Sequence, residues 1–123
     1  MKIYVAGPMR GKPFFNFPEF DKAAKALREA GHEVFNPAER DRQDDPHVGE
    51  SNPTGDIQLA QDKGFSLRKA LAADMKYICE EAEAIALLPG WELSKGAIAE
   101  YNTAKALDLK IFNIYPQDQY LLH

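Results

Sequence analysis

Apolar positions along the chain follow two alternating patterns, one typical of strands and one typical of helices. Short runs of aliphatic residues, bounded by turn-forming residues, predict β-strands. They span residues 2–6, 32–35, 83–88 and 110–115. Apolar residues spaced three or four apart predict amphipathic helices between the strands. These helices span residues 17–30, 66–81 and 94–108. Such alternation favours parallel pairing through right-handed crossovers, which predicts an α/β fold with a doubly wound sheet of four to five strands and flanking helices.

The ends of the predicted helices carry capping residues. Asn16, Ser66 and Ser94 precede the three helices and are expected N-caps, and Gly31 ends the first helix. In doubly wound sheets, ligands bind beyond the carboxyl ends of the strands. The glycine-bearing loops after the first and third strands are therefore the expected site.

One segment, from Asn36 to about residue 65, shows neither the strand pattern nor the helix pattern. It is polar and contains three prolines, and it is too long for an ordinary connection. We expect a lid, a binding loop or a disordered flap there. The tail from Pro116 to His123 carries no clear prediction.

Composition narrows the possible classes of function. The 123 residues correspond to one domain, and a net charge of −4 gives no electrostatic basis for binding duplex nucleic acid or an anionic membrane. The single cysteine, Cys79, cannot form an internal disulfide, which favours a reducing compartment and argues against a structural zinc site. No apolar run is long enough for a signal peptide or a membrane span, so we expect a soluble, cytoplasmic protein.

The first glycine loop is Gly7-Pro8-Met9-Arg10-Gly11. Glycines let backbone amides approach an anion, and Arg10 is a bidentate phosphate donor. The alternative is a tight turn with an exposed arginine. The loop is neither a Walker motif nor a dinucleotide fingerprint, which argues against an ATPase or a nicotinamide enzyme.

Two carboxylates interrupt the apolar faces of predicted helices. Asp74 falls inside the stripe that includes Leu67, Leu71 and Ile78, where an unpaired carboxylate is costly and needs partners or a cleft. It is either a functional group or a structural hydrogen-bond acceptor.

Glu100 interrupts the inner stripe of the third helix. Ala97, Tyr101, Ala104 and Leu107 form that stripe. Considered alone, Glu100 is best read as a glutamate at the stripe's edge that reaches solvent. Considered with Asp74, it suggests glycosidic chemistry, because such chemistry uses one carboxyl as nucleophile and another as acid or base.

Several other residues lie near the expected site. Ser94 and Gly96 open the third helix, whose free amides and dipole suit an anion, although Ser94 also serves as a cap. The hydroxyl of Tyr4 either reaches a catalytic carboxylate or is satisfied at the edge of the core. Trp91 either stacks on a base or packs beneath its loop. The histidines lack metal-ligand spacing, so we expect no metal.

These residues, in this order, resemble the nucleoside 2-deoxyribosyltransferase superfamily, with closest similarity to short bacterial and phage proteins. The resemblance rests on residues 2–9, on Asp74 and on residues 88–100. It implies a flavodoxin-like (Rossmann-like) sheet, a nucleoside or nucleotide substrate, and no metal or organic cofactor. Glu100 would attack C1′ of the sugar, Tyr4 would hydrogen-bond Glu100, and Asp74 would manage the proton of the base. The resemblance also implies a homodimer or larger homo-oligomer, with a neighbouring subunit completing each site.

Ser94 separates two branches of that superfamily. Transferases tend to carry an aspartate six residues before the nucleophile, whereas the hydrolytic branch, which acts on deoxynucleoside 5′-monophosphates, carries a serine there together with a Gly-x-x-Arg-Gly loop. Ser94 and residues 7–11 match the hydrolytic branch. The expected activity is therefore nucleotide N-glycosidase, and the alternatives are a base-exchanging deoxyribosyltransferase and a non-catalytic nucleotide-binding or sensor module.

Overall fold

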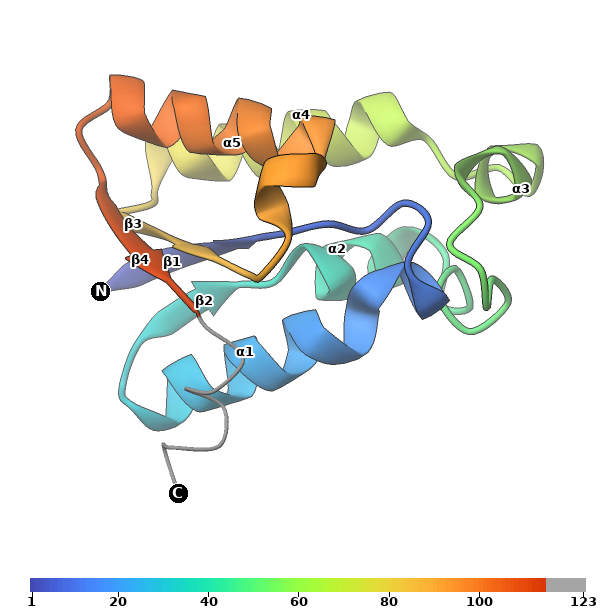
Figure 1. Ribbon diagram of the computed structural model, residues 1–123, viewed down its shortest axis with the longest axis horizontal. Helices are drawn as coiled ribbons and strands as arrows, with labels where there is room; N and C mark the ends of the chain where they lie inside the picture. Colours follow the sequence, from blue (N-terminus) through green and yellow to red (C-terminus); the bar gives the residue numbers. More distant parts are fainter. Residues whose placement is uncertain (115–123) are drawn as a thin grey trace.

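The computed structural model describes residues 1–114 and contains a four-stranded, fully parallel sheet between two layers of helices (Figure 1). The strands are β1 (Lys2–Ala6), β2 (Glu33–Phe35), β3 (Ala84–Leu87) and β4 (Lys110–Asn113). Their order in the sheet is β2-β1-β3-β4, and every neighbouring pair is parallel. This order matches that of flavodoxin-like sheets and confirms the predicted doubly wound α/β fold.

Helices cover both faces of the sheet. Helix α1 (Phe17–Glu29) packs on one face, and α4 (Leu67–Glu80) and α5 (Lys95–Ala106) pack on the other (Figure 1). Because side chains alternate along a strand, β1 contributes Val5 to the core beneath α1, and Tyr4 and Ala6 to the core beneath α4 and α5. This alternation brings Tyr4 onto the face of the sheet that is covered by α4 and α5, the two helices whose apolar stripes are interrupted by a carboxylate.

The segment after β2 is folded, so the prediction of a long loop is wrong. It contains α2 (Pro37–Asp44) and α3 (Ile57–Asp62). The side chain of Asn36 accepts the backbone N–H of Ala38, and Asp56 caps α3 in the same way. Both helices are short and bury few apolar residues. Their capping residues, and not an apolar stripe, are what marks them in the sequence.

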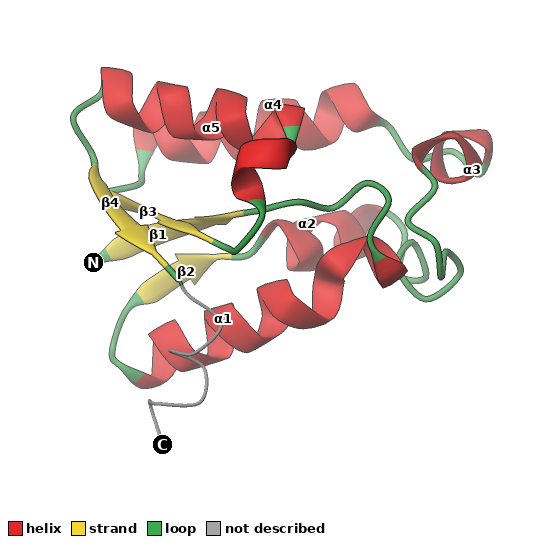
Figure 2. Ribbon diagram, viewed as in Figure 1, coloured by secondary structure: helices red, strands yellow, loops and turns green. Residues whose placement is uncertain are grey.

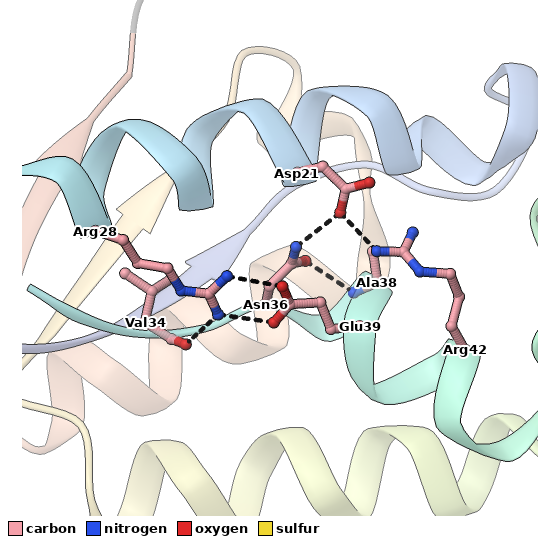
Figure 3. Close-up of polar contacts among 7 residues, drawn as sticks. All are labelled: Asp21, Arg28, Val34, Asn36, Ala38, Glu39 and Arg42. Carbon is pink, nitrogen blue, oxygen red and sulfur yellow. Dashed lines mark hydrogen bonds and ion pairs between the residues drawn. The ribbon is translucent and has the colours of Figure 1, made fainter.

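Polar contacts fix α2 against α1 (Figure 3). The amide of Asn36 donates to Asp21 at 2.9 Å, and Arg42 donates to the same carboxylate oxygen at 2.8 Å. Arg28 forms two hydrogen bonds of 2.7 Å to Glu39. Since these contacts hold both ends of α2, its buried side is presented to the rest of the molecule in one orientation.

The predicted caps are correct for two of the three main helices. Ser66 and Ser94 each accept a backbone N–H from the first turn of their helix, at 3.2 Å. Asn16 is not a capping side chain. It has a φ of 62° and follows Phe14 and Phe15, whose φ angles are 53° and 55°. A short helical element, η1 (Pro13–Asn16), thus enters α1 through a left-handed turn.

Two leucines expected on buried stripes are partly exposed. Leu71 is 36% exposed and lies at the mouth of a cavity, and Leu107 is 45% exposed because α5 ends before it. The last strand ends at Asn113, two residues before the predicted end at Tyr115. Tyr115 itself and the tail lie outside the described residues. Within residues 1–114, no helix is both long and apolar enough to cross a membrane.

Candidate active site

A cavity of about 370 Å³ lies beyond the carboxyl ends of β1 and β3. The chain passes from β1 to β2 on one side and from β3 to β4 on the other, so the loops after β1 and β3 diverge (Figure 2). Such a divergence opens a crevice at the sheet edge. The loop after β1, helix α2 and the N-terminal turns of α4 and α5 border this cavity.

Tyr4, Asp74 and Glu100 meet inside the cavity. Tyr4 is fully buried, and its hydroxyl donates a hydrogen bond of 2.6 Å to Oε2 of Glu100. Glu100 is only 6% exposed, so the interpretation of a glutamate that reaches solvent is wrong. Asp74 is 8% exposed, and among the described residues its Oδ1 has no hydrogen-bond partner. A purely structural acceptor would have its oxygens satisfied by the protein.

The two carboxyls differ in their electrostatic surroundings. Burial raises the pKa of both, and the charge of Glu100 raises the pKa of Asp74 further. The hydrogen bond from Tyr4 lowers the pKa of both carboxyls, and contact with Asp74 lowers that of Glu100 without offsetting the effect of burial. Because each carboxyl acts on the other in the opposite direction, a proton shared by the pair favours Asp74 and the negative charge favours Glu100.

Tyr4 remains a neutral donor in these surroundings. Burial and the neighbouring carboxylates raise the pKa of its hydroxyl well above the usual value. It therefore keeps its proton at neutral pH and holds Oε2 of Glu100 in place. The arrangement supplies a carboxylate, an acid and an orienting donor within one buried site.

Three cationic side chains line the rim of the cavity. Arg10, Lys12 and Lys95 are exposed there, and none of them forms an ion pair with any described residue. Ser94, which caps α5, also lines the cavity. The cavity thus has a positive entrance and a buried cluster of carboxyls, which suits a ligand with an anionic end.

The first glycine loop divides into two parts. Gly7 to Arg10 line the cavity, and a Cβ at Gly7 would lie 2.7 Å from Cβ of Leu88, so glycine is required there for close packing. Gly11 is not part of the cavity wall. Its N–H donates to the carbonyl of Gly55 at 2.8 Å, so this amide is already bound within the protein.

Trp91 and Gly96, also expected at the site, have different positions. Trp91 packs on Tyr101 with ring centroids 4.5 Å apart and does not line the cavity, in agreement with the packing alternative. Gly96 lines the cavity, and a Cβ there would meet nothing within 4 Å. Of these two residues, only Gly96 is therefore in a position to contact a ligand directly.

The sequence did not reveal one further carboxyl of the site, Asp41. It lies on α2, is 5% exposed and lines the cavity. Its helix was hidden in the polar segment, although Asn36-Pro37-Ala38-Glu39 is typical of a helix start. Apolar walls were missed as well. They include Phe15, Phe17, Phe20 and Phe65.

Within the described chain, no group of three or more histidine, cysteine, aspartate or glutamate residues is arranged to hold a metal ion. Comparison with known families gives one match, which covers residues 1–113. This chain belongs to the DUF4406 family, described as a domain of unknown function. No curated protein and no solved structure matches the chain. The functional proposal for this DUF4406 protein therefore rests on the geometry of the site and on the resemblance of its residues to the deoxyribosyltransferases.

Proposed function

We propose that this DUF4406 protein cleaves the N-glycosidic bond of a 2′-deoxynucleoside 5′-monophosphate through a covalent intermediate on Glu100. The observation that carries the proposal is the buried 2.6 Å hydrogen bond from Tyr4 to Glu100, with Asp74 beside it in one cavity. A positioned carboxylate next to a carboxylic acid is the apparatus of retaining glycosidic chemistry.

In the first step, Oε1 of Glu100, the oxygen that Tyr4 does not hold, attacks C1′ of the sugar. The bond between C1′ and the base nitrogen breaks, and its electron pair stays with the base. Asp74 donates its proton to the departing base, so the base leaves neutral. The product of this step is a glycosyl ester of Glu100, with Tyr4 still bound to the other carboxylate oxygen.

In the second step, water resolves the ester. Asp74, now ionised, removes a proton from a water molecule that attacks C1′, and the bond between C1′ and Glu100 breaks. Asp74 regains its proton and Glu100 regains its charge. The net products are a free base and deoxyribose 5-phosphate, and no step requires a metal or an organic cofactor.

The rim of the cavity supports a phosphorylated substrate. Arg10, Lys12 and Lys95 supply three positive charges that are not neutralised by other described residues. Ser94 contributes no charge that would repel a phosphate, and it opens the positive end of α5. This combination favours the nucleotide over the nucleoside.

The direct test is an assay of free base released from deoxynucleoside 5′-monophosphates. We expect the wild-type protein to release base and Glu100→Gln to release none. The matched control is Glu92→Gln, because Glu92 is an exposed glutamate of the short helix η2 (Trp91–Leu93) outside the cavity. Binding without turnover in the wild type would instead indicate a sensor module, and adding a second free base would reveal transfer by formation of a new nucleotide.

A further inference from the structure

Asp41 is a buried carboxyl that the proposed reaction does not use. It is 5% exposed and lines the cavity that holds Asp74 and Glu100. Its Oδ1 is fully buried and has no hydrogen-bond partner among the described residues. An unpaired buried carboxylate oxygen is costly for the protein, so its persistence at the wall of a site calls for an external partner.

The neighbouring arginines do not neutralise Asp41. Arg40 forms an ion pair with Asp44 at 2.8 Å, and Arg42 forms one with Asp21 at 2.8 Å. Both side chains are thus engaged elsewhere, and Arg42 belongs to the contacts that anchor α2 (Figure 3). Helix α2 therefore holds the carboxyl of Asp41 in the cavity wall with no cation of the protein bound to it.

The surroundings of Asp41 combine one polar group with flat apolar walls. Burial raises its pKa to about 7, and Asp74, when ionised, contributes to the increase. Phe15, Phe17 and Phe65 line the same cavity. A planar ring with one hydrogen-bond donor at its edge matches this environment, since the ring contacts aromatic side chains and the donor satisfies the carboxylate.

We propose that Asp41 recognises the nucleobase and selects bases that carry an exocyclic amino group, as cytosine and adenine do. This inference rests on the proposed function, which places the departing base beside Asp74. Ionised Asp41 only accepts hydrogen bonds, so it pairs with an amino group and repels the keto oxygen that uracil or hypoxanthine carries at the same position.

The size of the expected preference follows from the loss of a charged hydrogen bond. Such bonds contribute about 1.5–3 kcal/mol, which corresponds to a ratio of about 10- to 100-fold in affinity. Asp41→Asn replaces an acceptor by an amide that also donates, at nearly the same volume. The amide N–H₂ would bind the keto oxygen, so the variant should prefer the keto base.

The test measures affinity without turnover, by calorimetry on Glu100→Gln protein at pH 8, where Asp41 is ionised. The ligands are dCMP and dUMP, which differ in the amino or keto group at C4 and in the proton that uracil carries on N3. A second pair, dAMP and dIMP, differs in the same way at C6 and N1. We expect the amino-bearing nucleotide of each pair to bind 10- to 100-fold more tightly. Adding Asp41→Asn should abolish or reverse the preference, whereas adding Asp62→Asn, an exposed aspartate of α3 outside the cavity, should leave it unchanged.

Three results would overturn the inference, and a fourth would contradict only the glycosidase activity. Equal affinity for the two members of both pairs would overturn the role of Asp41, and so would a preference that survives Asp41→Asn. If none of the four nucleotides bound, the role of Asp41 and the phosphate site would both be overturned. A clear amino preference in a wild-type protein that releases no base would support recognition by Asp41 and contradict only the glycosidase activity.

Discussion

Tyr4→Phe isolates the hydrogen bond on which the proposed mechanism depends. The substitution keeps the buried ring, which stacks on Phe35 at a centroid distance of 5.5 Å, and removes only the hydroxyl that donates to Glu100. Hydrogen bonds to charged groups contribute about 1.5–3 kcal/mol. At 1.36 kcal/mol per unit, the pKa of Glu100 should rise by about 1–2 units.

The sign of the pH effect follows from the roles of the two carboxyls. Activity should increase as Glu100 loses its proton and decrease as Asp74 loses its own, which gives a bell-shaped profile of kcat/KM for base release. Tyr4→Phe removes a contact that lowers the pKa of both carboxyls, so both limbs should move to higher pH. At a pH on the acid limb, kcat/KM should fall by about 10- to 100-fold.

Tyr77→Phe is the matched control. The hydroxyl of Tyr77 is also buried but has no hydrogen-bond partner in the described chain, and its ring packs on Phe35 at 4.6 Å. Removing it should leave the profile in place. If Tyr4→Phe left the acid limb where it is in the wild type, or moved it to lower pH, Tyr4 would not stabilise the Glu100 carboxylate and the assigned role would be refuted.

Four further substitutions probe the first glycine loop, two helix caps and the buried carboxyl of α2. Gly7→Ala should lower the free energy of unfolding by about 1–3 kcal/mol, measured in urea, since the new Cβ would clash with Leu88; an unchanged value would contradict the packing role. Ser94→Ala and Ser66→Ala should each cost about 1 kcal/mol in the same assay, but only Ser94→Ala should raise KM for deoxynucleotides; equal KM values would remove Ser94 from the phosphate site. Asp41 has a folded-state pKa of about 7, above its unfolded value, so its ionisation destabilises the fold as pH rises from about 4 to 7. Asp41→Asn should therefore stabilise the protein at pH 8, by up to about 4 kcal/mol, and not at pH 4; equal gains at both would exclude this cause.

The sheet and its main helices were predictable because their burial is regular. The central strands β1 and β3 are buried on both faces and are therefore continuous apolar runs, whereas α1, α4 and α5 bury one face and show three- to four-residue spacing. Ser66 and Ser94 were predictable as caps because their effect is local. Asn16 was not, because its backbone depends on the left-handed turn at Phe14 and Phe15, which no local pattern marks.

The candidate site was predictable in part. Asp74 and Glu100 stood out because they interrupt apolar stripes, and their meeting with Tyr4 follows from the face of β1 on which Tyr4 lies. Asp41 could not be found in the same way, because α2 has a polar composition and no stripe to interrupt. Its burial depends on the contacts of Arg28 and Asn36 with neighbouring elements, which are tertiary interactions.

The most direct measurement of the central claim is mass spectrometry of the protein, acid-quenched during reaction with a deoxynucleoside 5′-monophosphate. The account predicts a transient mass increase equal to one deoxyribose phosphate residue, located by proteolysis on the peptide that contains Glu100. The adduct should be absent from Glu100→Gln and present in Glu92→Gln. Two results would contradict Glu100 as the nucleophile. One is release of base by the wild type without any adduct during turnover, and the other is an adduct on a different residue.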